Sequence, residues 1–589
     1  MSGPWPSRTE TRRADLRRWA WMFAIVWVGL SPLVPAQEPE DELGLLFSTQ
    51  VRFDAQGIPV VTLGLYQGAR RVWLSGVDGM ELTFTEERDQ KRAPRVLSLS
   101  PGPRISVALG ESVPGEVRYF AAVESLPFDQ RDSLPETVRR WEAKGQKVQV
   151  FELGTVFGIQ GHVIDNRSYV LVGPAFPTEK EAQEAADRLY QKHRVKTFVH
   201  PQLTRRPSGK LRILDARGRA LAVAVDLIRC RSRSRRPLIL HRVDLDVAAQ
   251  PVPASPAPAA SAREPTRDKQ VAGAILLPLD QLGKLAVVNE LDVERLLRGL
   301  IPAEIPTRAP LEALKAQAVV ARGELLAKIG SRHFLEPFRI CAQTHCQVYS
   351  GVDVEDPRTD QAVRATRGEL LFRGSAMVDS VYSASCGGHT EDNDAVWSDP
   401  PNPSLRGRPD TEEAEAEKYR DINGQLSRFL GSAPPAFCGL SSFNRKNLFR
   451  WEKRFSVSEI SSLVAAVKPI GLVASLQVLE RGVSGRAKVL RIVGAEGDLV
   501  VQRELPIRQL FGNLKSALFE ITVETDEEQM PRAFVFKGGG WGHGVGMCQI
   551  GAIGMAERGH GYRAILGHYY GGAEVFRLYG SGAEARKKR

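Results

Sequence analysis

The chain has 589 residues and a formal net charge of +11, and 42% of its residues are hydrophobic. At about 150 residues per domain, this length excludes a single domain. After residue 36, no apolar run approaches the roughly 20 residues that a membrane-spanning helix requires. The positive charge is typical of proteins that contact an anionic polymer or surface.

The N-terminal segment 1–36 has the order of a secretory signal peptide. A basic head over 12–18 precedes an apolar run over 19–30, and residues 34–36 provide a small-residue cleavage site. The apolar run is too short for a membrane anchor. We therefore expect export to the periplasm or cell envelope, with no membrane span after cleavage, and export argues against nucleic acid as a partner.

The residues that follow predict several modules. Residues 40–125 alternate apolar and polar side chains between glycine and aspartate turns, which predicts a β-rich module. Residues 126–205 combine strands with a helix over 179–193 and predict an α/β module. Strands are predicted again over 206–247, and the Pro/Ala-rich residues 248–268 predict a linker. The fold class expected is α+β and multidomain, with the linker separating these modules from the C-terminal half.

The α/β module has a strand at 169–172, a Gly-Pro-Ala-Phe turn, and a polar helix that begins after Thr178. This order resembles a SPOR-type module. The resemblance implies binding to glycan strands that have lost their peptides. An unrelated α/β module is the alternative, because a strand, such a turn and an amphipathic helix occur in many folds.

The C-terminal half, 270–580, begins with strand-like apolar runs. Helices are predicted over 291–300 and, from Pro310 onward, over 311–328, with Glu304 at a helix end or turn between them. The second helix has a predicted buried stripe of Leu311, Leu314, Ala318, Ala321 and Leu325. A strand is expected over 378–384, and a helix over 547–557.

Four ordered blocks in this half resemble the SpoIID/LytB family, and they are 304–322, 344–349, 382–391 and 538–552. The resemblance implies a mixed α/β domain that acts as a peptidoglycan lytic transglycosylase on glycan strands. Some members of the LytB type are instead non-catalytic wall-binding or amidase-enhancing proteins, which would make an amidase or another wall hydrolase a partner. No cofactor is required for the transglycosylase chemistry.

That chemistry needs one carboxylic acid, which protonates the glycosidic oxygen and then acts as a base. Glu304 and Glu312 are the two candidates. Glu304 stands at a turn, from which its carboxyl group could enter a cleft. Glu312 lies in the first turn of a helix, where the helix dipole favours the ionised form and lowers the pKa. We therefore favour Glu304, with Glu312 as the alternative.

The glycine-rich block is expected to form one wall of the glycan cleft. Gly540 permits positive φ and close backbone approach, Trp541 can stack on a sugar, and His543 and Gln549 supply polar groups. His389 is assigned either to support of the acid or to a structural hydrogen bond with the backbone. A tight structural turn is the alternative for the glycine-rich block.

Histidine and cysteine gather between residues 333 and 346. The family resemblance implies a structural Zn²⁺ held by His333, Cys341 and Cys346, and His345 could replace His333. Disulfides are the competing explanation, with Cys341 bonded to Cys346 and Cys386 to Cys438. A third functional hypothesis, a peptidase or amidase that uses zinc or Cys386 near His389, predicts cleavage of stem peptides.

Overall fold

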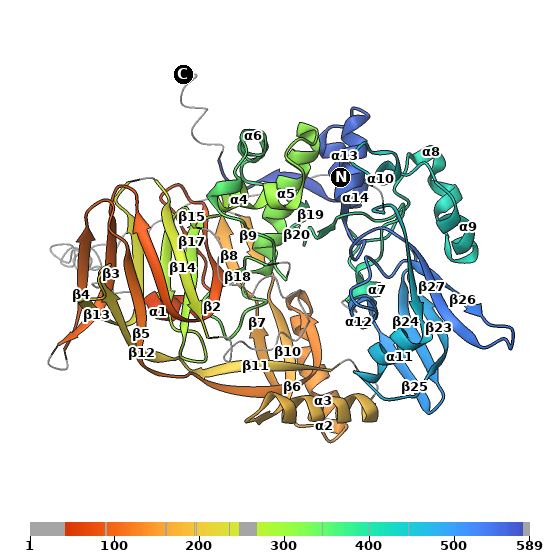
Figure 1. Cartoon of the computed structure of the whole chain (residues 1–589), viewed down its shortest axis with the longest axis horizontal. Helices are drawn as coiled ribbons and strands as arrows, with labels where there is room; N and C mark the ends of the chain where they lie inside the picture. The colour runs from red at the N-terminus through yellow and green to blue at the C-terminus, as the bar shows by residue number, and fades with distance from the viewer. Residues whose placement is uncertain are drawn as a thin grey trace, which may run out of the picture.

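The computed structural model describes residues 42–580, except 89–90, 160–161, 194, 196, 235, 247–267, 344, 398–399 and 446. The predicted signal peptide, 1–36, and nearly all of the predicted linker, 248–268, lie outside the described residues. None of the described helices is long and apolar enough to cross a membrane. The described chain mixes helices with several separate sheets, as expected for a multidomain protein with both element types (Figure 1).

A large sheet at the left of Figure 1 contains a closed ring of hydrogen-bonded strands. In ring order these are β2 (Pro59–Gly76), β17 (Leu285–Asp292), β16 (Ala274–Pro278), β13 (Ala220–Ser232), β12 (Ser208–Leu214) and β5 (Ile105–Val113). Outside the ring, the same sheet includes β1 (Arg52–Phe53), β3 (Met80–Arg88), β4 (Lys91–Leu99), β14 (Leu238–Leu245), β15 (Lys269–Val271) and β18 (Ile340–Cys341), and α1 (Glu42–Leu46) precedes β1.

This sheet corrects the separation predicted at the linker. Strands from 40–125, from 206–247 and from the start of 270–580 all belong to it, and β14 pairs with β15 across residues 247–267. The physical reason is that β16 and β17 are buried along almost their whole length. Such strands need hydrogen-bonding neighbours on both edges, and the N-terminal strands supply them.

The α/β module has the element order β6 (Glu116–Pro127), α2 (Leu134–Ala143), β7 (Gln149–Leu153), β10 (Ser168–Phe176), α3 (Glu179–His193) and β11 (Phe198–Arg205), with a short 3-10 turn before α2. Its antiparallel sheet has the order β11-β6-β10-β7. The predicted helix over 179–193 is confirmed, and Thr178 caps it through reciprocal bonds with Glu181. The predicted start at residue 126 is wrong, because β6 begins at Glu116 and pairs with β10 and β11.

The two helices of this module cover one face of its sheet. Val123 and Leu171 pack with Trp141 of α2 on that face. Phe120 and Val170 lie in a separate apolar cluster with Phe151, and no helix residue belongs to that cluster. The hairpin of β8 (Val156–Ile159) and β9 (His162–Asp165) extends from the module into the main core.

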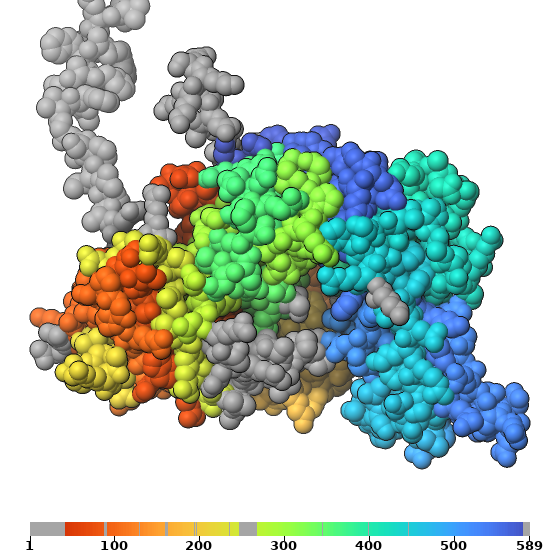
Figure 2. Space-filling view, turned by 45° about the horizontal axis from the view of Figure 1, so that its top comes forward, coloured from red at the N-terminus to blue at the C-terminus, as the bar shows by residue number. Residues whose placement is uncertain are grey.

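A helical layer joins the closed ring to the C-terminal segments. It contains α4 (Val293–Glu304), α5 (Leu311–Lys328), α6 (Pro357–Ala365), α13 (Gln549–Glu557) and α14 (Tyr562–Tyr569), with strands β19 (Glu369–Arg373), β20 (Ala376–Met377) and β29 (Glu574–Arg577) beside them. In Figure 2 the green residues of this layer lie between the red-to-yellow N-terminal part and the blue C-terminal part. The predicted start and end of α5 are confirmed.

Helix α5 is more deeply buried than a single stripe predicts. Along with the expected Leu314, Ala318, Ala321 and Leu325, most of its remaining side chains are buried too, and Leu311 is only partly buried. Neighbouring elements pack around it, among them α4, α6, α13, α14 and β19. A helix that is enclosed in this way has no solvent-exposed face, so its sequence does not show a single apolar stripe.

The remaining elements form two small sheets, which share an aromatic core that includes Phe511, Phe519, Phe534 and Phe536. One sheet has the order β22 (Arg450–Ser456), β27 (Pro531–Gly539), β26 (Phe519–Thr525), and the other has β23 (Val473–Arg481), β24 (Ala487–Gly494), β25 (Gly497–Gln502). The helices of this region are α7 (Asn393–Val396), α8 (Glu413–Ala416), α9 (Leu426–Gly431), α10 (Phe437–Leu440), α11 (Val457–Ala465) and α12 (Glu504–Leu510).

The strand expected over 378–384 is shorter in the structure. Only Tyr382–Ser383 forms a strand, β21, and it pairs in parallel with β28 (Met547–Cys548). The helix expected over 547–557 is present as α13. The pairing of β21 with β28 brings the third and fourth sequence blocks side by side.

Candidate functional site

The four sequence blocks that the family resemblance singled out meet at Glu304, the last residue of α4. The backbone N–H of Val348 donates to Glu304 Oε1 at 2.9 Å. The Gln549 side chain donates to the Glu304 carbonyl at 3.0 Å and to Gln317 Oε1 at 3.2 Å. The Tyr382 side chain interacts with the carboxyl group and lowers the pKa of Glu304. Segments that are far apart in the sequence therefore meet at one glutamate.

Contacts at both ends of α4 and along its side fix the position of Glu304. Asp292 caps the start of α4 by accepting a bond from the Arg295 N–H at 2.8 Å. The fully buried Arg322 of α5 donates two hydrogen bonds, of 2.8 and 3.0 Å, to the Glu294 carboxylate of α4. At the other end, Ile305 is extended, as the residue before a proline tends to be. This confirms the prediction that Glu304 lies at a helix end.

The environment of Glu304 favours the protonated carboxyl group. Burial raises the pKa of Glu304, and this outweighs the hydrogen bond from Val348 and the Tyr382 hydroxyl, which both lower it. The residue as a whole is half-buried and is not sealed inside the core. A carboxylic acid with a raised pKa is better suited to donate a proton than an ordinary carboxyl group.

A second buried carboxyl group lies near Glu304. Burial raises the pKa of Glu324 to about 7, although the neighbouring Lys328 lowers it. Glu324 contacts Lys328, and its other oxygen accepts a bond from Gln347 at 2.9 Å. Sequence reasoning did not select Glu324 and Tyr382. The one signal available was Glu324 with Lys328, two charged residues four apart in a helix predicted to pack in the core.

Glu312, the alternative acid, has a different environment. Its carboxylate accepts bonds from Lys315 at 2.6 Å and from the Tyr562 N–H at 2.9 Å. These contacts outweigh partial burial and lower the pKa of Glu312. A carboxylate that is held ionised at the start of α5, and that anchors α14, is a poor proton donor.

The glycine-rich block forms a loop between β27 and β28, and its backbone lies against the third block. Ser385 and Trp541 exchange backbone bonds of 3.0 and 2.8 Å. Gly540 has φ of 77°, and a Cβ there would lie 2.6 Å from the Ser385 carbonyl oxygen, so only glycine fits. Trp541 is 47% exposed, with Lys515 above its ring, and can receive a ligand.

His543 is held in a neutral form. Burial lowers the pKa of His543 to about 3, and Arg486 lowers it further. Its Nδ1 accepts the Val545 N–H at 3.0 Å, which leaves the proton of the neutral ring on Nε2. The ring packs against Trp397, with 5.0 Å between the ring centroids. His543 can therefore donate a hydrogen bond but cannot act as a cation at neutral pH.

His389 was assigned either to support of the acid or to a backbone bond, and the described contacts match the second role. The side chain is 1% exposed, and its Nδ1 lies 2.6 Å from the Thr390 carbonyl oxygen. Burial lowers the pKa of His389 to about 4. The nearby Cys386, which the peptidase hypothesis invoked, has its sulfur 3.6 Å from that of Cys438 instead.

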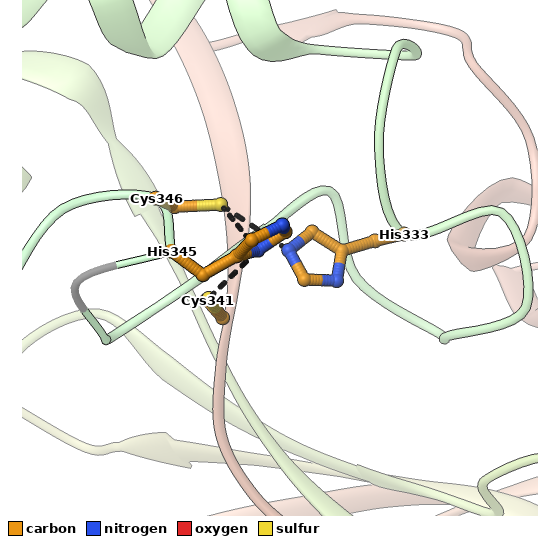
Figure 3. A group of neighbouring side chains, drawn as sticks. All are labelled: His333, Cys341, His345 and Cys346. Atoms are coloured by element: carbon orange, nitrogen blue, oxygen red, sulfur yellow. Dashed lines mark hydrogen bonds between the residues drawn. The ribbon is translucent and has the colours of Figure 1, made fainter. Parts of the chain in front are cut away.

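His333, Cys341, His345 and Cys346 converge in one cluster (Figure 3). His333 Nε2 lies 3.2 Å from Cys346 Sγ, and His345 Nδ1 lies 3.8 Å from both sulfurs. Both histidines that were alternatives therefore face the two cysteines. His333 has φ of 56°, a strained value for a residue with a side chain. The six cysteines of the chain are all free in the structure, so neither predicted disulfide is formed.

The donor set of this cluster fits a tetrahedral Zn²⁺. One atom from each of the four residues lies within 4.8 Å of the others, and two sulfurs with two imidazole nitrogens are the ligands that structural zinc prefers. The contact with Cys341 lowers the pKa of Cys346, and His333 and His345 lower it further despite burial. The same contact and burial raise the pKa of Cys341, so the surroundings favour a thiolate at Cys346 only.

Comparison with known proteins agrees with these positions. The family model described as "Stage II sporulation protein", SpoIID, matches residues 281–372, which include Glu304 and the His/Cys cluster. A domain of unknown function, DUF8618, matches residues 391–546. Together the two models cover most of the C-terminal half. The first begins at residue 281, between β16 and β17, which are two strands of the closed ring.

Relatives cover the same half. An amidase enhancer of Bacillus subtilis is 28% identical over 296 residues, which are 47% of this chain and 40% of that protein. The stage II sporulation protein D of Bacillus amyloliquefaciens is 24% identical over 309 residues, 49% of this chain and 75% of that protein. An uncharacterized protein of Brachyspira hyodysenteriae is 27% identical over 292 residues, 49% of this chain and 68% of that protein. In its C-terminal half, this chain therefore contains a domain of the SpoIID/LytB family.

Proposed function

We propose that this chain is an exported peptidoglycan lytic transglycosylase with Glu304 as its single acid and base. The supporting observation is that three distant segments, represented by Val348, Tyr382 and Gln549, converge on Glu304, a half-buried residue whose pKa is raised by burial. Glu312 lacks this environment, because Lys315 and the Tyr562 N–H hold it ionised.

The proposed reaction needs no second carboxylate. Protonated Glu304 gives its proton to the glycosidic oxygen between N-acetylmuramic acid and N-acetylglucosamine, and the bond from that oxygen to the anomeric carbon breaks. The C6 hydroxyl of the same muramic acid then bonds to the anomeric carbon and returns a proton to the Glu304 carboxylate. The products are a 1,6-anhydro sugar and a free 4-hydroxyl end, and no water is consumed.

Trp541 and the neutral His543 provide the proposed sugar contacts. The exposed Trp541 ring can stack on a saccharide, and Nε2 of His543 can donate to a hydroxyl or acetamido oxygen. Gly540 keeps the loop close to Ser385, and Gln549 ties the loop to the Glu304 backbone. Sugar binding at this loop would therefore be rigidly coupled to the acid.

The zinc that we propose for His333, Cys341, His345 and Cys346 would be structural. A bound ion there would supply cross-linking without taking part in bond cleavage. Cys346 is two residues from Val348, whose N–H binds Glu304, and Lys328 Nζ donates to the Cys346 carbonyl at 3.3 Å. The four protein ligands would hold this segment, and with it the donor to the acid, in place.

We further propose that the α/β module is SPOR-like and binds the glycan beside the catalytic half. Apart from the inserted β8–β9 hairpin, its element order is strand, helix, two strands, helix, strand, and this order supports the proposal. The face of its sheet without helices contains Phe120, Phe151 and Phe198. A cavity of about 660 Å³ beside that face is lined by Phe151 and His200, together with Phe334 from the SpoIID-like half.

The test is mass spectrometry of muropeptides after digestion of purified glycan strands and whole sacculi. Glu304→Gln should abolish 1,6-anhydro products, with a rate loss of about 100-fold to 10,000-fold, because the general acid is removed. Glu312→Gln is the matched control and should retain the products. If the Glu304→Gln chain releases anhydro products at the wild-type rate, Glu304 is not the acid.

A non-catalytic role is the second candidate, because one relative is named an amidase enhancer. In that case the wild-type chain would bind strands, release no anhydro products, and increase the rate at which an added amidase removes stem peptides. A peptidase or amidase would instead cleave stem peptides by itself and leave glycan chains intact. The same muropeptide analysis separates the three outcomes.

A further inference from the structure

A second cluster of metal-ligand side chains lies apart from the His/Cys cluster of the proposed zinc. Cys386, Asp410, Cys438 and Cys548 come from four separate segments, and one donor atom of each lies within 4.8 Å of the others. All four residues are fully buried, at 0% exposure. We propose that these residues form a second metal site, which binds one thiophilic divalent cation of the Zn²⁺ type. This proposal does not depend on the transglycosylase reaction.

The spacing of the donors suits one tetrahedral ion. A tetrahedral zinc with bonds of about 2.3 Å to sulfur places neighbouring sulfurs about 3.8 Å apart. The sulfurs of Cys386 and Cys438 are 3.6 Å apart, whereas a disulfide would need about 2.05 Å. A disulfide between them would also leave the third thiol, Cys548, buried without a partner of its own kind. A multi-iron cluster would hold the cysteines further apart.

The surroundings of Cys548 favour a thiolate. Its sulfur accepts backbone N–H groups from Cys386 at 3.2 Å and from Gly551 at 3.3 Å, and it caps the start of α13. A helix start is a site where a thiolate is stabilised. A thiolate is the form of cysteine that binds a divalent cation.

Asp410 is oriented as a fourth ligand. Tyr569 donates to one carboxylate oxygen at 2.7 Å, and the Cys438 N–H donates to the other at 3.0 Å. These bonds fix the carboxylate and leave lone pairs free on both oxygens. Gly551 makes room for it, because a Cβ there would lie 2.8 Å from Asp410 Oδ1. Bonds of this kind to the outer side of a ligand are typical of metal sites.

Two buried or half-buried guanidinium groups would balance the charge. A divalent cation with three thiolates and one carboxylate carries two negative charges in excess. Arg486 donates to the Cys386 carbonyl at 2.8 Å, and Arg450 donates to the Gly387 carbonyl at 2.8 Å. A buried charge without such partners would be strongly destabilising. The cluster therefore has the size, donor type and charge environment of a tetrahedral zinc site.

A metal ion at this site would cross-link the glycine-rich loop to the segments that pack against it. Cys548 precedes Gln549, which contacts Glu304, and Cys386 lies next to Gly387, which packs on Gly539 and Gly540. Cys438 adds α10, which packs closely on α13. One ion would thus fasten four segments behind the candidate acid while remaining sealed from solvent.

The experiment measures zinc per chain in purified mature protein by plasma mass spectrometry, with variants that separate the two clusters. The wild type should carry two zinc ions. His333→Ala combined with Cys346→Ser should retain one zinc, and adding Cys438→Ser to that chain should remove it. Cys230→Ala is the matched control, because Cys230 is buried but belongs to neither cluster, and this variant should keep two.

The readout that does not need variants is X-ray absorption of the wild type, which counts sulfur ligands per zinc. Both sites together should give about 2.5 sulfurs per zinc on average, and the His/Cys cluster alone would give two.

The proposal is overturned if the folded His333→Ala, Cys346→Ser chain binds no zinc, or if alkylation without reductant shows Cys386 disulfide-bonded to Cys438. If that variant does not fold, a sulfur count of two in the wild type overturns it. An empty His/Cys cluster with zinc still bound by the second site would contradict only the earlier zinc proposal.

Discussion

At the scale of single residues, this protein gives glutamate several different roles through its surroundings. Glu294 forms a bidentate ion pair with the buried Arg322, whereas the contact with Lys315 lowers the pKa of Glu312. Glu324 is buried beside Lys328 with a pKa near 7. Among the glutamates that the structure describes, only Glu304 combines a raised pKa with partial exposure at a point where several sequence blocks meet. The candidate acid is therefore distinguished by its environment and not by its residue type.

The Tyr382 hydroxyl offers a test of the acid at this scale. A proton donor is active below its pKa, so the rate falls as the pH rises through the pKa of Glu304. Tyr382 lowers that pKa, against the effect of burial. Tyr382→Phe should therefore raise the pKa and move the falling limb of log(kcat/KM) to higher pH.

The measurement is a pH profile of anhydro-product release. Tyr562→Phe is the control, because that hydroxyl binds Glu369 at 3.0 Å and does not contact Glu304. The control profile should match the wild type. A shift of the Tyr382→Phe limb to lower pH would contradict the assignment of Glu304 as the proton donor.

At the scale of elements, close helix packing depends on glycine. Helix α13 lies against α10, and a Cβ on Gly554 would be 2.2 Å from the Phe437 carbonyl oxygen. Helix α14 contains Gly567, where a Cβ would meet no described atom within 4 Å. The same substitution should therefore have opposite effects in two adjacent helices.

Gly554→Ala should destabilise the chain by about 1–3 kcal/mol, because the methyl group forces α13 away from the backbone of α10. Gly567→Ala should stabilise it by about 0.5–1 kcal/mol, because alanine loses less backbone entropy in a helix. Thermal unfolding followed by circular dichroism measures both. Equal midpoints for the two variants would show that the backbone contact at Phe437 does not limit the packing.

At the scale of the whole molecule, the SpoIID-like half is not an independent unit. Its first strands, β16 and β17, complete a ring whose other members come from residues 59–232. The helical core above the ring belongs to the same apolar cluster as the ring strands. The N-terminal residues are therefore part of the scaffold that positions α4, and with it Glu304.

A split chain tests this. The fragment 268–589 alone should be insoluble or lack cooperative unfolding, because β17 loses β2 and β16 loses β13. Coexpression with 42–246 should restore a soluble complex that copurifies. Size-exclusion chromatography and thermal unfolding measure the outcome. A fragment 268–589 that folds alone and retains activity would contradict the single-scaffold interpretation.

The sequence by itself determined the local features of this protein. Start and stop signals placed α3, α5 and α13 within about two residues, because caps, prolines and glycines act through neighbouring backbone groups. The same local logic separated Glu304 from Glu312, since a helix start favours an ionised carboxylate. The family resemblance also located the blocks that meet at the site.

Tertiary structure alone decided which distant segments share a sheet or a cluster. Strand pairing across residues 247–267 leaves no local signal, because apolar runs do not specify their partners. The disulfide alternative paired Cys386 with Cys438, but no sequence pattern indicated that Asp410 and Cys548 lie with them. The pKa of Glu304 likewise depends on burial by elements from throughout the C-terminal half, so no sequence window contains it.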